Sequence, residues 1–135
     1  MIEPPLRHHT AAAIDFISHQ LGLRNEPVMQ DWAFEVAETS DLPRYLALFE
    51  EVVGQEDVRF TLVDMIIQAF EESDFELGTN PEWSAFLARL VENIETHGSQ
   101  IWYWASWDVE LEDAWRVAPF MRKMCETHFS SQEQS

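Results

Sequence analysis

Apolar side chains recur at the spacing of an α-helix from the start of this chain. Thr10 is a suitable N-cap for a first helix, and Gly22 is a suitable residue just after its end. Three apolar residues between them fall on one helical face: Ile14, Ile17 and Leu21. Residues 30–38 alternate apolar and polar positions, but a lone strand would have no partner, so we expect an extended or short helical segment there.

Two apolar stripes in the middle of the chain predict two further helices. Ser40 or Asp41 caps the first of them, Pro43 lies in its first turn and Gly54 ends it. Its apolar face comprises Leu42, Tyr45, Leu46, Phe49, Val52 and Val53. The second helix opens at Asp57 and is apolar around so much of its circumference that we expect it to lie centrally in the fold.

The second half of the chain has its own start and stop signals. Asn80 and Pro81 form a cap and first-turn pair for a strongly amphipathic helix, and Gly98 is the expected residue after its end. Ser99 then caps a short aromatic helix that reaches residue 107.

These signals together predict an all-α fold. A last helix begins at Pro119 after an acidic connection at residues 108–113, which gives a single-domain bundle of five to six helices over residues 1–135. Residues 41–73 and 80–107 each have the pattern of an αα-hairpin, and the two hairpins could stack in a solenoid-like manner.

Composition and charge narrow the class of protein. Of the 135 residues, 46% are hydrophobic, which is enough to bury a core, and 25 acidic residues against 8 Lys plus Arg give a net charge of −17. That acidity disfavours direct binding to nucleic acid or to a membrane surface, because both need clustered basic residues. With one cysteine and no long apolar run, we expect a cytoplasmic protein with a flexible leader at residues 1–9 and a frayed tail at residues 130–135.

No catalytic signature is present in the sequence. The histidines form neither the HExxH pattern of zinc proteases nor the Glu-x-x-His pattern of di-iron bundles. We expect His8 and His9 to be solvated. We expect His97, near a helix C-terminus, to cap that helix or to interact with its dipole. Cys125 is expected to be a buried, inert thiol without a catalytic partnership with His128. The sequence therefore indicates a protein that is not an enzyme, with no cofactor and no metal.

An aromatic segment followed by acids is the best candidate for a binding site. The side chains of Trp102, Tyr103, Trp104 and Trp107 cannot all point inward from one short helix, so some must face a groove or the surface. Aromatic surface beside acids is typical of protein-binding faces. We expect the partner to bind at six residues, namely Trp104, Trp107, Asp108, Glu110, Glu112 and Asp113. Arg116 and Arg122 are expected to pair with nearby acids.

Four stretches, in the order QDWAFEVAE, FTLVDMIIQAFEE, IWYWASWDVE and WRVAPFMRKM, make residues 30–124 resemble small acidic helical proteins of bacteria that look like immunity proteins. The resemblance rests on layout and hydrophobic pattern and assigns no functional residue. It implies a cytoplasmic, non-catalytic inhibitor that neutralises a cognate toxin by tight binding. Independently, a net charge of −17 complements a basic toxin such as a nuclease and would speed association with it.

Two other hypotheses stay open. A nucleic-acid mimic would inhibit DNA-binding proteins by presenting carboxylates in an ordered row, in place of phosphates. A small metal-dependent enzyme would bring Glu, Asp and His side chains together in one pocket. The oligomeric state and the identity of the partner do not follow from the sequence.

Overall fold

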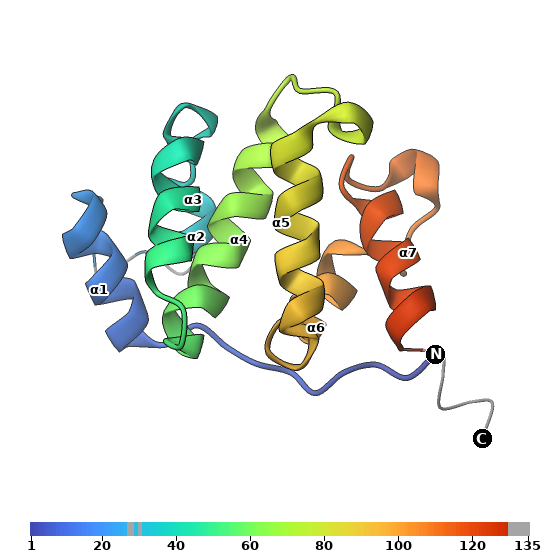
Figure 1. Cartoon of the computed structure of the whole chain (residues 1–135), viewed down its shortest axis with the longest axis horizontal. Helices are drawn as coiled ribbons and strands as arrows, with labels where there is room; N and C mark the ends of the chain where they lie inside the picture. Colours follow the sequence, from blue (N-terminus) through green and yellow to red (C-terminus); the bar gives the residue numbers. More distant parts are fainter. Residues whose placement is uncertain (27–28, 30, 130–135) are drawn as a thin grey trace. The chain divides into compact units, whose positions relative to one another are not determined.

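The computed structural model describes residues 1–26, 29 and 31–129, and this part of the chain contains helices and no strands. The predicted all-α class is therefore confirmed. The α-helices, shown in Figure 1, are α1 (Ala11–Leu21), α2 (Trp32–Val36), α3 (Leu42–Glu51), α4 (Glu56–Glu72), α5 (Pro81–Glu92), α6 (Ile94–Trp104) and α7 (Ala118–His128). Three short 3-10 turns accompany them: η1 (Thr39–Asp41), η2 (Leu77–Thr79) and η3 (Leu111–Asp113). A helix able to cross a membrane is absent from the described residues.

The helices divide between two compact units. The first, which we call the α4 unit, is His8–Phe75 and contains α1 to α4. The second, the α6 unit, combines Met1–Arg7 with the described residues from Glu76 onward and contains α5 to α7. The predicted single domain and the solenoid-like stacking of the hairpins stay predictions, and the predicted tail at residues 130–135 lies outside the described residues.

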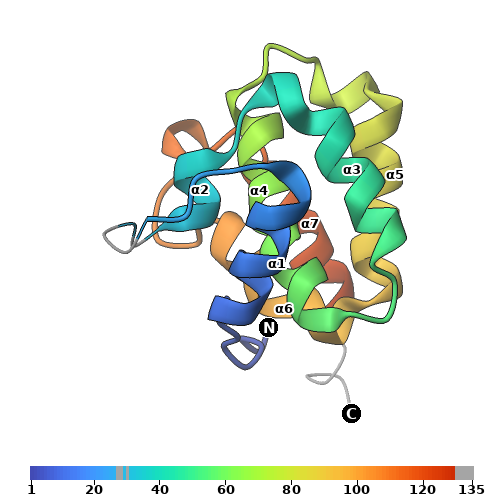
Figure 2. The same ribbon diagram turned by 90° about the vertical axis from the view of Figure 1, so that its left-hand side faces the viewer.

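Helix α4 is the centre of its unit, as its broad apolar surface predicted. It contacts α1, α2 and α3, which flank it in Figure 2, and its side chains are buried on several sides. The α3–α4 pair is the predicted αα-hairpin. Among the buried residues of α4 are charged ones: the Arg59 guanidinium donates to the Phe49 carbonyl oxygen at 3.0 Å and lies 3.9 Å from the Phe49 ring centroid. A buried charge of this kind is tolerated because it is hydrogen-bonded.

Local capping signals explain three of the helix ends. The Thr10 hydroxyl accepts a hydrogen bond from the backbone N–H of Ala13, and Gly22 adopts the left-handed conformation, with φ of 66°. The Asn80 side chain accepts a hydrogen bond from the backbone N–H of Trp83 at 2.9 Å. These predicted ends are confirmed because each depends only on residues within one turn of the helix.

The helix end predicted at Gly98 is wrong. Helix α5 ends earlier, at Asn93, where φ is −126°, and α6 runs straight through Gly98 and Ser99. The glycine serves packing within the α6 unit, because a Cβ at this position would lie 3.0 Å from the Pro4 Cβ and 3.5 Å from the Phe129 Cζ. Gly98 therefore makes room for the N-terminal segment.

Two further sequence expectations concern the middle of the chain, and the structure agrees with the first and differs from the second. Within residues 30–38 the structure forms the short helix α2, one of the two conformations expected; Gln30 itself lies outside the described residues. Val53, expected on the apolar face of α3, is 67% exposed because the helix ends at Glu51 and the chain turns at Gly54, with φ of 93°.

Residues 1–9, expected as a flexible leader, make specific contacts in both units. In the α6 unit the backbone N–H of Ile2 donates to the Phe129 carbonyl oxygen at 3.1 Å. In the α4 unit the His9 Nε2 lies 2.6 Å from the Asp64 Oδ2, and the imidazole packs near Phe34 and Phe60. The expectation of a solvated His9 is therefore wrong: its side chain is 21% exposed, and that of Asp64 is 8% exposed.

We predict that His9→Ala lowers the free energy of unfolding by about 1–2 kcal/mol, because it removes a hydrogen bond to a buried carboxylate on α4. The matched control is His8→Ala, since His8 is the exposed neighbour of His9 and should change stability by less than about 0.5 kcal/mol. Urea denaturation measures both values. Equal effects of the two substitutions would show that the His9–Asp64 bond contributes nothing.

We also predict that Gly98→Ala and Pro4→Gly are coupled. Alanine in a helix interior is favoured over glycine by about 1 kcal/mol, but here its Cβ would meet Pro4. The gain should appear in the Pro4→Gly background and be reduced or reversed in the natural background. A double-mutant cycle on unfolding free energies tests this, and simple additivity would contradict the contact.

Candidate partner-binding surface

The surface around the end of α6 is shaped by one arginine from α7. The Arg122 Nε donates to the Ala105 carbonyl oxygen at 2.7 Å, and its Nη2 donates to the carbonyl oxygens of Ser106 at 2.5 Å and Val109 at 2.7 Å. The guanidinium also lies 5.1 Å from the Trp107 ring centroid, a cation–π distance. Arg122 therefore binds backbone carbonyls and an aromatic ring, and the prediction that it pairs with acids is wrong.

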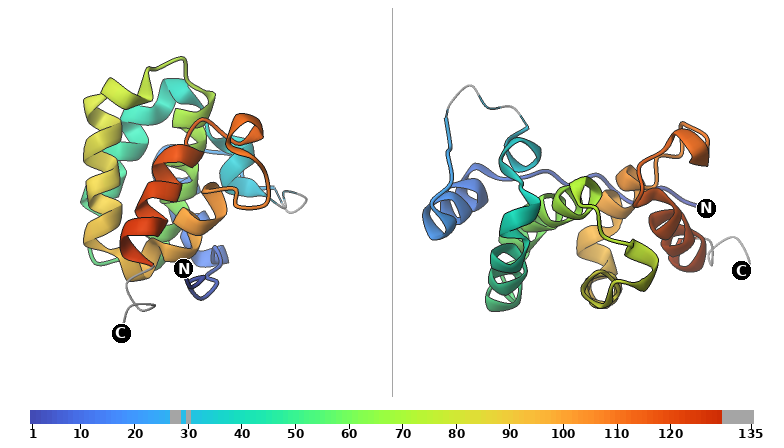
Figure 3. Two further views of the ribbon diagram at one scale, coloured as in Figure 1. Left: turned by 90° about the vertical axis from the view of Figure 1, so that its right-hand side faces the viewer. Right: turned by 90° about the horizontal axis from the view of Figure 1, so that it is seen from above.

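This clamp fixes an unusual turn. Ser106 has φ of 53°, the left-handed region that few non-glycine residues adopt. The turn sends the chain away from α6 into the connection that leads to α7, drawn in orange in Figure 3. Helices α6 and α7 pack against each other, so the arginine and the turn that it holds lie on neighbouring elements.

The aromatic side chains of this region form one pair and one cluster of three. The Trp102 and Trp107 rings lie 5.9 Å apart between centroids. Trp115, which follows the acidic connection, lies 5.4 Å from Tyr103 and 4.6 Å from Trp104. Trp104 is only 1% exposed, whereas Tyr103 is 55% and Trp115 is 37% exposed, so the buried ring supports the exposed ones.

Side chains from the pair and from the cluster line a hollow of about 430 Å³, which we call the aromatic cleft. Its volume falls within the range of small-ligand sites, roughly 300–1,000 Å³. Six residues line it: Trp102, Tyr103, Ser106, Trp107, Asp108 and Trp115. In the described part of the chain, no hydrogen-bond donor or cation pairs with the Asp108 carboxylate. The cleft thus combines four aromatic side chains with one carboxylate that faces solvent.

The six predicted partner-binding residues lie in three different environments: the aromatic cleft, the exposed loop after it and the core. Trp107 and Asp108 line the aromatic cleft. The remaining predicted acids, Glu110, Glu112 and Asp113, are exposed on the connection that follows, which we call the acidic loop (residues 108–113). Their role in binding stays a prediction.

The expectation that Trp104 anchors a partner at the surface is corrected by the structure, because this side chain is buried. Its place at the surface is taken by Tyr103 and Trp115. Trp115 is not among the six predicted residues, although the sequence carries a signal for it: it lies outside any helical apolar stripe, beside the acidic loop. An aromatic residue in such a position has no helix face on which to be buried.

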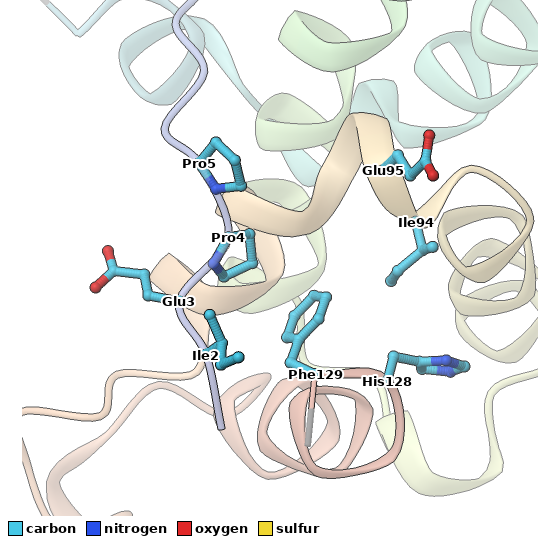
Figure 4. A pocket seen from close by; sticks show the side chains of 8 residues that line it. All are labelled: Ile2, Glu3, Pro4, Pro5, Ile94, Glu95, His128 and Phe129. Carbon is cyan, nitrogen blue, oxygen red and sulfur yellow. The ribbon is translucent and has the colours of Figure 1, made fainter. Parts of the chain in front are cut away.

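A second hollow in the α6 unit, about 410 Å³ in volume, lies beside the N-terminal segment. Figure 4 shows its lining, with the Phe129 ring near Pro4 and the Glu3, Glu95 and His128 side chains pointing in different directions. General acid–base chemistry needs such groups within hydrogen-bond reach of one substrate. This hollow therefore offers an apolar surface without a convergent set of titratable groups.

The other residues considered for chemistry have structural surroundings. His97 is fully buried within α6, and its Nδ1 lies 2.9 Å from the Gln100 Oε1, so the predicted role at a helix C-terminus is wrong. Cys125 is buried, as predicted, and burial raises the pKa of its thiol to about 11, while contact with the Trp107 side chain opposes the shift. His128 lines the hollow of Figure 4, whereas the thiol lies beside Trp107. No group of three or more His, Cys, Asp or Glu side chains placed to hold a metal occurs among the described residues.

Comparisons with known protein families, with curated proteins and with solved structures found no match to this chain.

We predict that Cys125 makes stability fall at alkaline pH. The thiol pKa is about 11 in the folded protein against 9.0 when exposed, so the neutral thiol stabilises the fold fully below about pH 9. That contribution is lost as pH rises towards 11, by up to about 2 kcal/mol. Unfolding free energies of the natural protein and of Cys125→Ala, measured at about pH 8 and about pH 10.5, should show a smaller decrease for the variant. Parallel decreases would contradict this origin.

Proposed function

We propose that this protein is a non-catalytic inhibitor of the immunity type, which binds and neutralises a basic toxin, with a nuclease as the best-fitting class. The observation that supports this proposal most is the aromatic cleft: exposed aromatic rings around a carboxylate without a partner, next to the acidic loop. A surface of that kind meets the requirements of a protein-binding face better than those of a reaction site.

The composition of the surface matches the usual anatomy of tight interfaces. Tyrosine and tryptophan are enriched among the residues that contribute most binding energy, and a polar rim excludes water around them. Here Tyr103 and Trp115 are the exposed aromatic residues, and Val109 and Leu111, 40% and 50% exposed, add apolar area within the acidic loop. The acids of that loop would form the rim.

The charge of the whole chain supports a basic partner. A nuclease must hold phosphates with lysine and arginine, so its active surface is positive. A chain of net charge −17 attracts such a surface over a distance and can raise the association rate by about 10- to 1,000-fold. Rapid capture suits an inhibitor that must act before a toxin does damage.

Two further expectations belong to the same proposal. An inhibitor of a toxin made in the same cell would act in the cytoplasm. A chain with a single cysteine suits that reducing compartment, because it needs no internal disulfide. The solenoid-like stacking of the hairpins would provide an extended face for a partner.

We predict that neutralising the acidic loop slows association with the partner. The variant carries Asp108→Asn, Glu110→Gln, Glu112→Gln and Asp113→Asn, all at exposed positions. The tagged natural protein is first used to capture its partner at low salt from a lysate of the organism that carries it. The captured partner is then purified, and its association rate with the variant should fall by about tenfold or more at low salt.

The matched control removes the same amount of charge from other exposed positions, through Glu38→Gln, Glu51→Gln, Asp74→Asn and Glu76→Gln. If both variants slow association equally, net charge alone acts and the site is wrong. The inhibitory function itself is tested by adding the chain to the purified partner and measuring its toxic or nuclease activity. Capture of several DNA-binding proteins, without a single stoichiometric toxin, would favour a nucleic-acid mimic instead.

A further inference from the structure

The aromatic cleft has the chemistry of a cation-binding cage. Aromatic rings present their negative faces to a cation placed within about 6 Å of the ring centroid, and cages of several rings bind ammonium and guanidinium groups in this way. The cleft has two aromatic walls, Trp102 with Trp107 and Tyr103 with Trp115, and its volume of about 430 Å³ leaves room for one long side chain.

The carboxylate in the cleft specifies the charge of the occupant. Asp108 lines the same hollow as the four rings, and within the described residues no basic side chain neutralises it. The nearby guanidinium of Arg122 is committed elsewhere, to the carbonyl oxygens of Ala105, Ser106 and Val109. An occupant from outside therefore has both an unpaired negative charge and aromatic faces to bind.

The contact between Arg122 and Trp107 shows that guanidinium–indole packing fits this region of the surface. The Arg122 guanidinium lies 5.1 Å from the ring centroid while it keeps three hydrogen bonds to carbonyl oxygens. A guanidinium can do this because it is planar and weakly hydrated, so that it stacks on a ring without losing its in-plane donors. An ammonium group is compact and strongly hydrated, and gains less from the same surroundings.

We propose that the aromatic cleft receives one arginine side chain of the basic protein partner. The guanidinium would lie between the two aromatic walls and donate hydrogen bonds to the Asp108 carboxylate. This inference rests on the proposed function and deepens it, because it names the side chain that the partner inserts. In such an interface the arginine would be the central contact, and the rest of the acidic loop would surround it.

The test uses small probes, so that it does not require the partner. Nuclear magnetic resonance follows the indole N–H signals of the full-length protein during titration with N-acetyl-arginine methylamide up to about 100 mM. We expect a saturable shift of the signals from Trp102, Trp107 and Trp115. The signals of the buried Trp32 and Trp83 should stay unchanged. The corresponding lysine and norleucine amides separate guanidinium recognition from general cation binding and from apolar binding.

Substitutions then locate the probe. Asp108→Asn should weaken arginine binding by about fivefold or more, since it removes the charge that pairs with the guanidinium. The matched control is Asp74→Asn, at an exposed position outside the acidic loop and the cleft lining, and it should leave affinity unchanged. Tyr103→Leu, at a residue 55% exposed, removes part of one wall and should also weaken binding without disturbing the core.

Three results would overturn the inference: no saturable shift, equal binding of the arginine and norleucine probes, or equal effects of Asp108→Asn and Asp74→Asn. Its failure is distinguishable from failure of the proposed function. If the arginine probe binds but no toxin is neutralised, the cleft assignment stands and the immunity function is wrong. If a toxin is neutralised by a protein whose cleft ignores arginine, the function stands and this inference is wrong.

Discussion

The binding surface depends on the hydrogen bonds that a single guanidinium makes to the turn after α6. Carbonyl groups in a turn lie outside the hydrogen-bond ladder of a helix and need donors from elsewhere. Arg122 supplies donors to the Ala105, Ser106 and Val109 carbonyl oxygens at once. An arginine can do so because its donors are arranged in a rigid, planar fork. A lysine at this position would offer a single nitrogen in place of the two, Nε and Nη2, that bind these carbonyls.

The position of that guanidinium is itself set by the core. Arg122 lies on α7, whose adjoining face is buried through Met121, Met124 and Cys125. On the other side of the cleft, the buried ring of Trp104 supports Trp115 at 4.6 Å. Both walls of the cleft are thus attached to packed elements, although the connection between them is a loop. Pre-organised walls reduce the entropy that a partner must overcome on binding.

Local signals in the sequence predict the helices well and the cleft only in part. Thr10 and Asn80 cap helices through bonds to residues three positions later, so the pattern alone identifies them. In the sequence, Gly98 looks like a glycine that ends a helix. In the structure a side chain at this position would contact Pro4, which is far away in the sequence. No local pattern distinguishes a glycine that ends a helix from one that makes room for a distant residue. The crowding of aromatic residues in the sequence indicates the segment from Trp102 to Asp108 as a candidate surface. Which of those rings is buried depends on Trp115, whose place beside Trp104 follows from tertiary packing alone.

Several arginines of this acidic chain donate to backbone carbonyl groups, and the chain has too few basic residues to neutralise its acids. Arg44 donates to the Leu21 carbonyl oxygen at 2.7 Å, and Arg59 donates to that of Phe49 at 3.0 Å, as Arg122 does at the end of α6. Arg44 and Arg59 also pair with one acid each, Asp41 at 3.5 Å and Glu50 at 3.4 Å, but 8 Lys plus Arg can neutralise at most 8 of the 25 acids. Such a surface attracts any basic protein through its long-range field, but that attraction is screened by salt and does not distinguish one partner from another. Selectivity must then come from short-range contacts, and the aromatic cleft is where exposed rings and an unpaired carboxylate occur together. In the function that we propose, the net charge determines how fast partners arrive, and the cleft determines which of them stay.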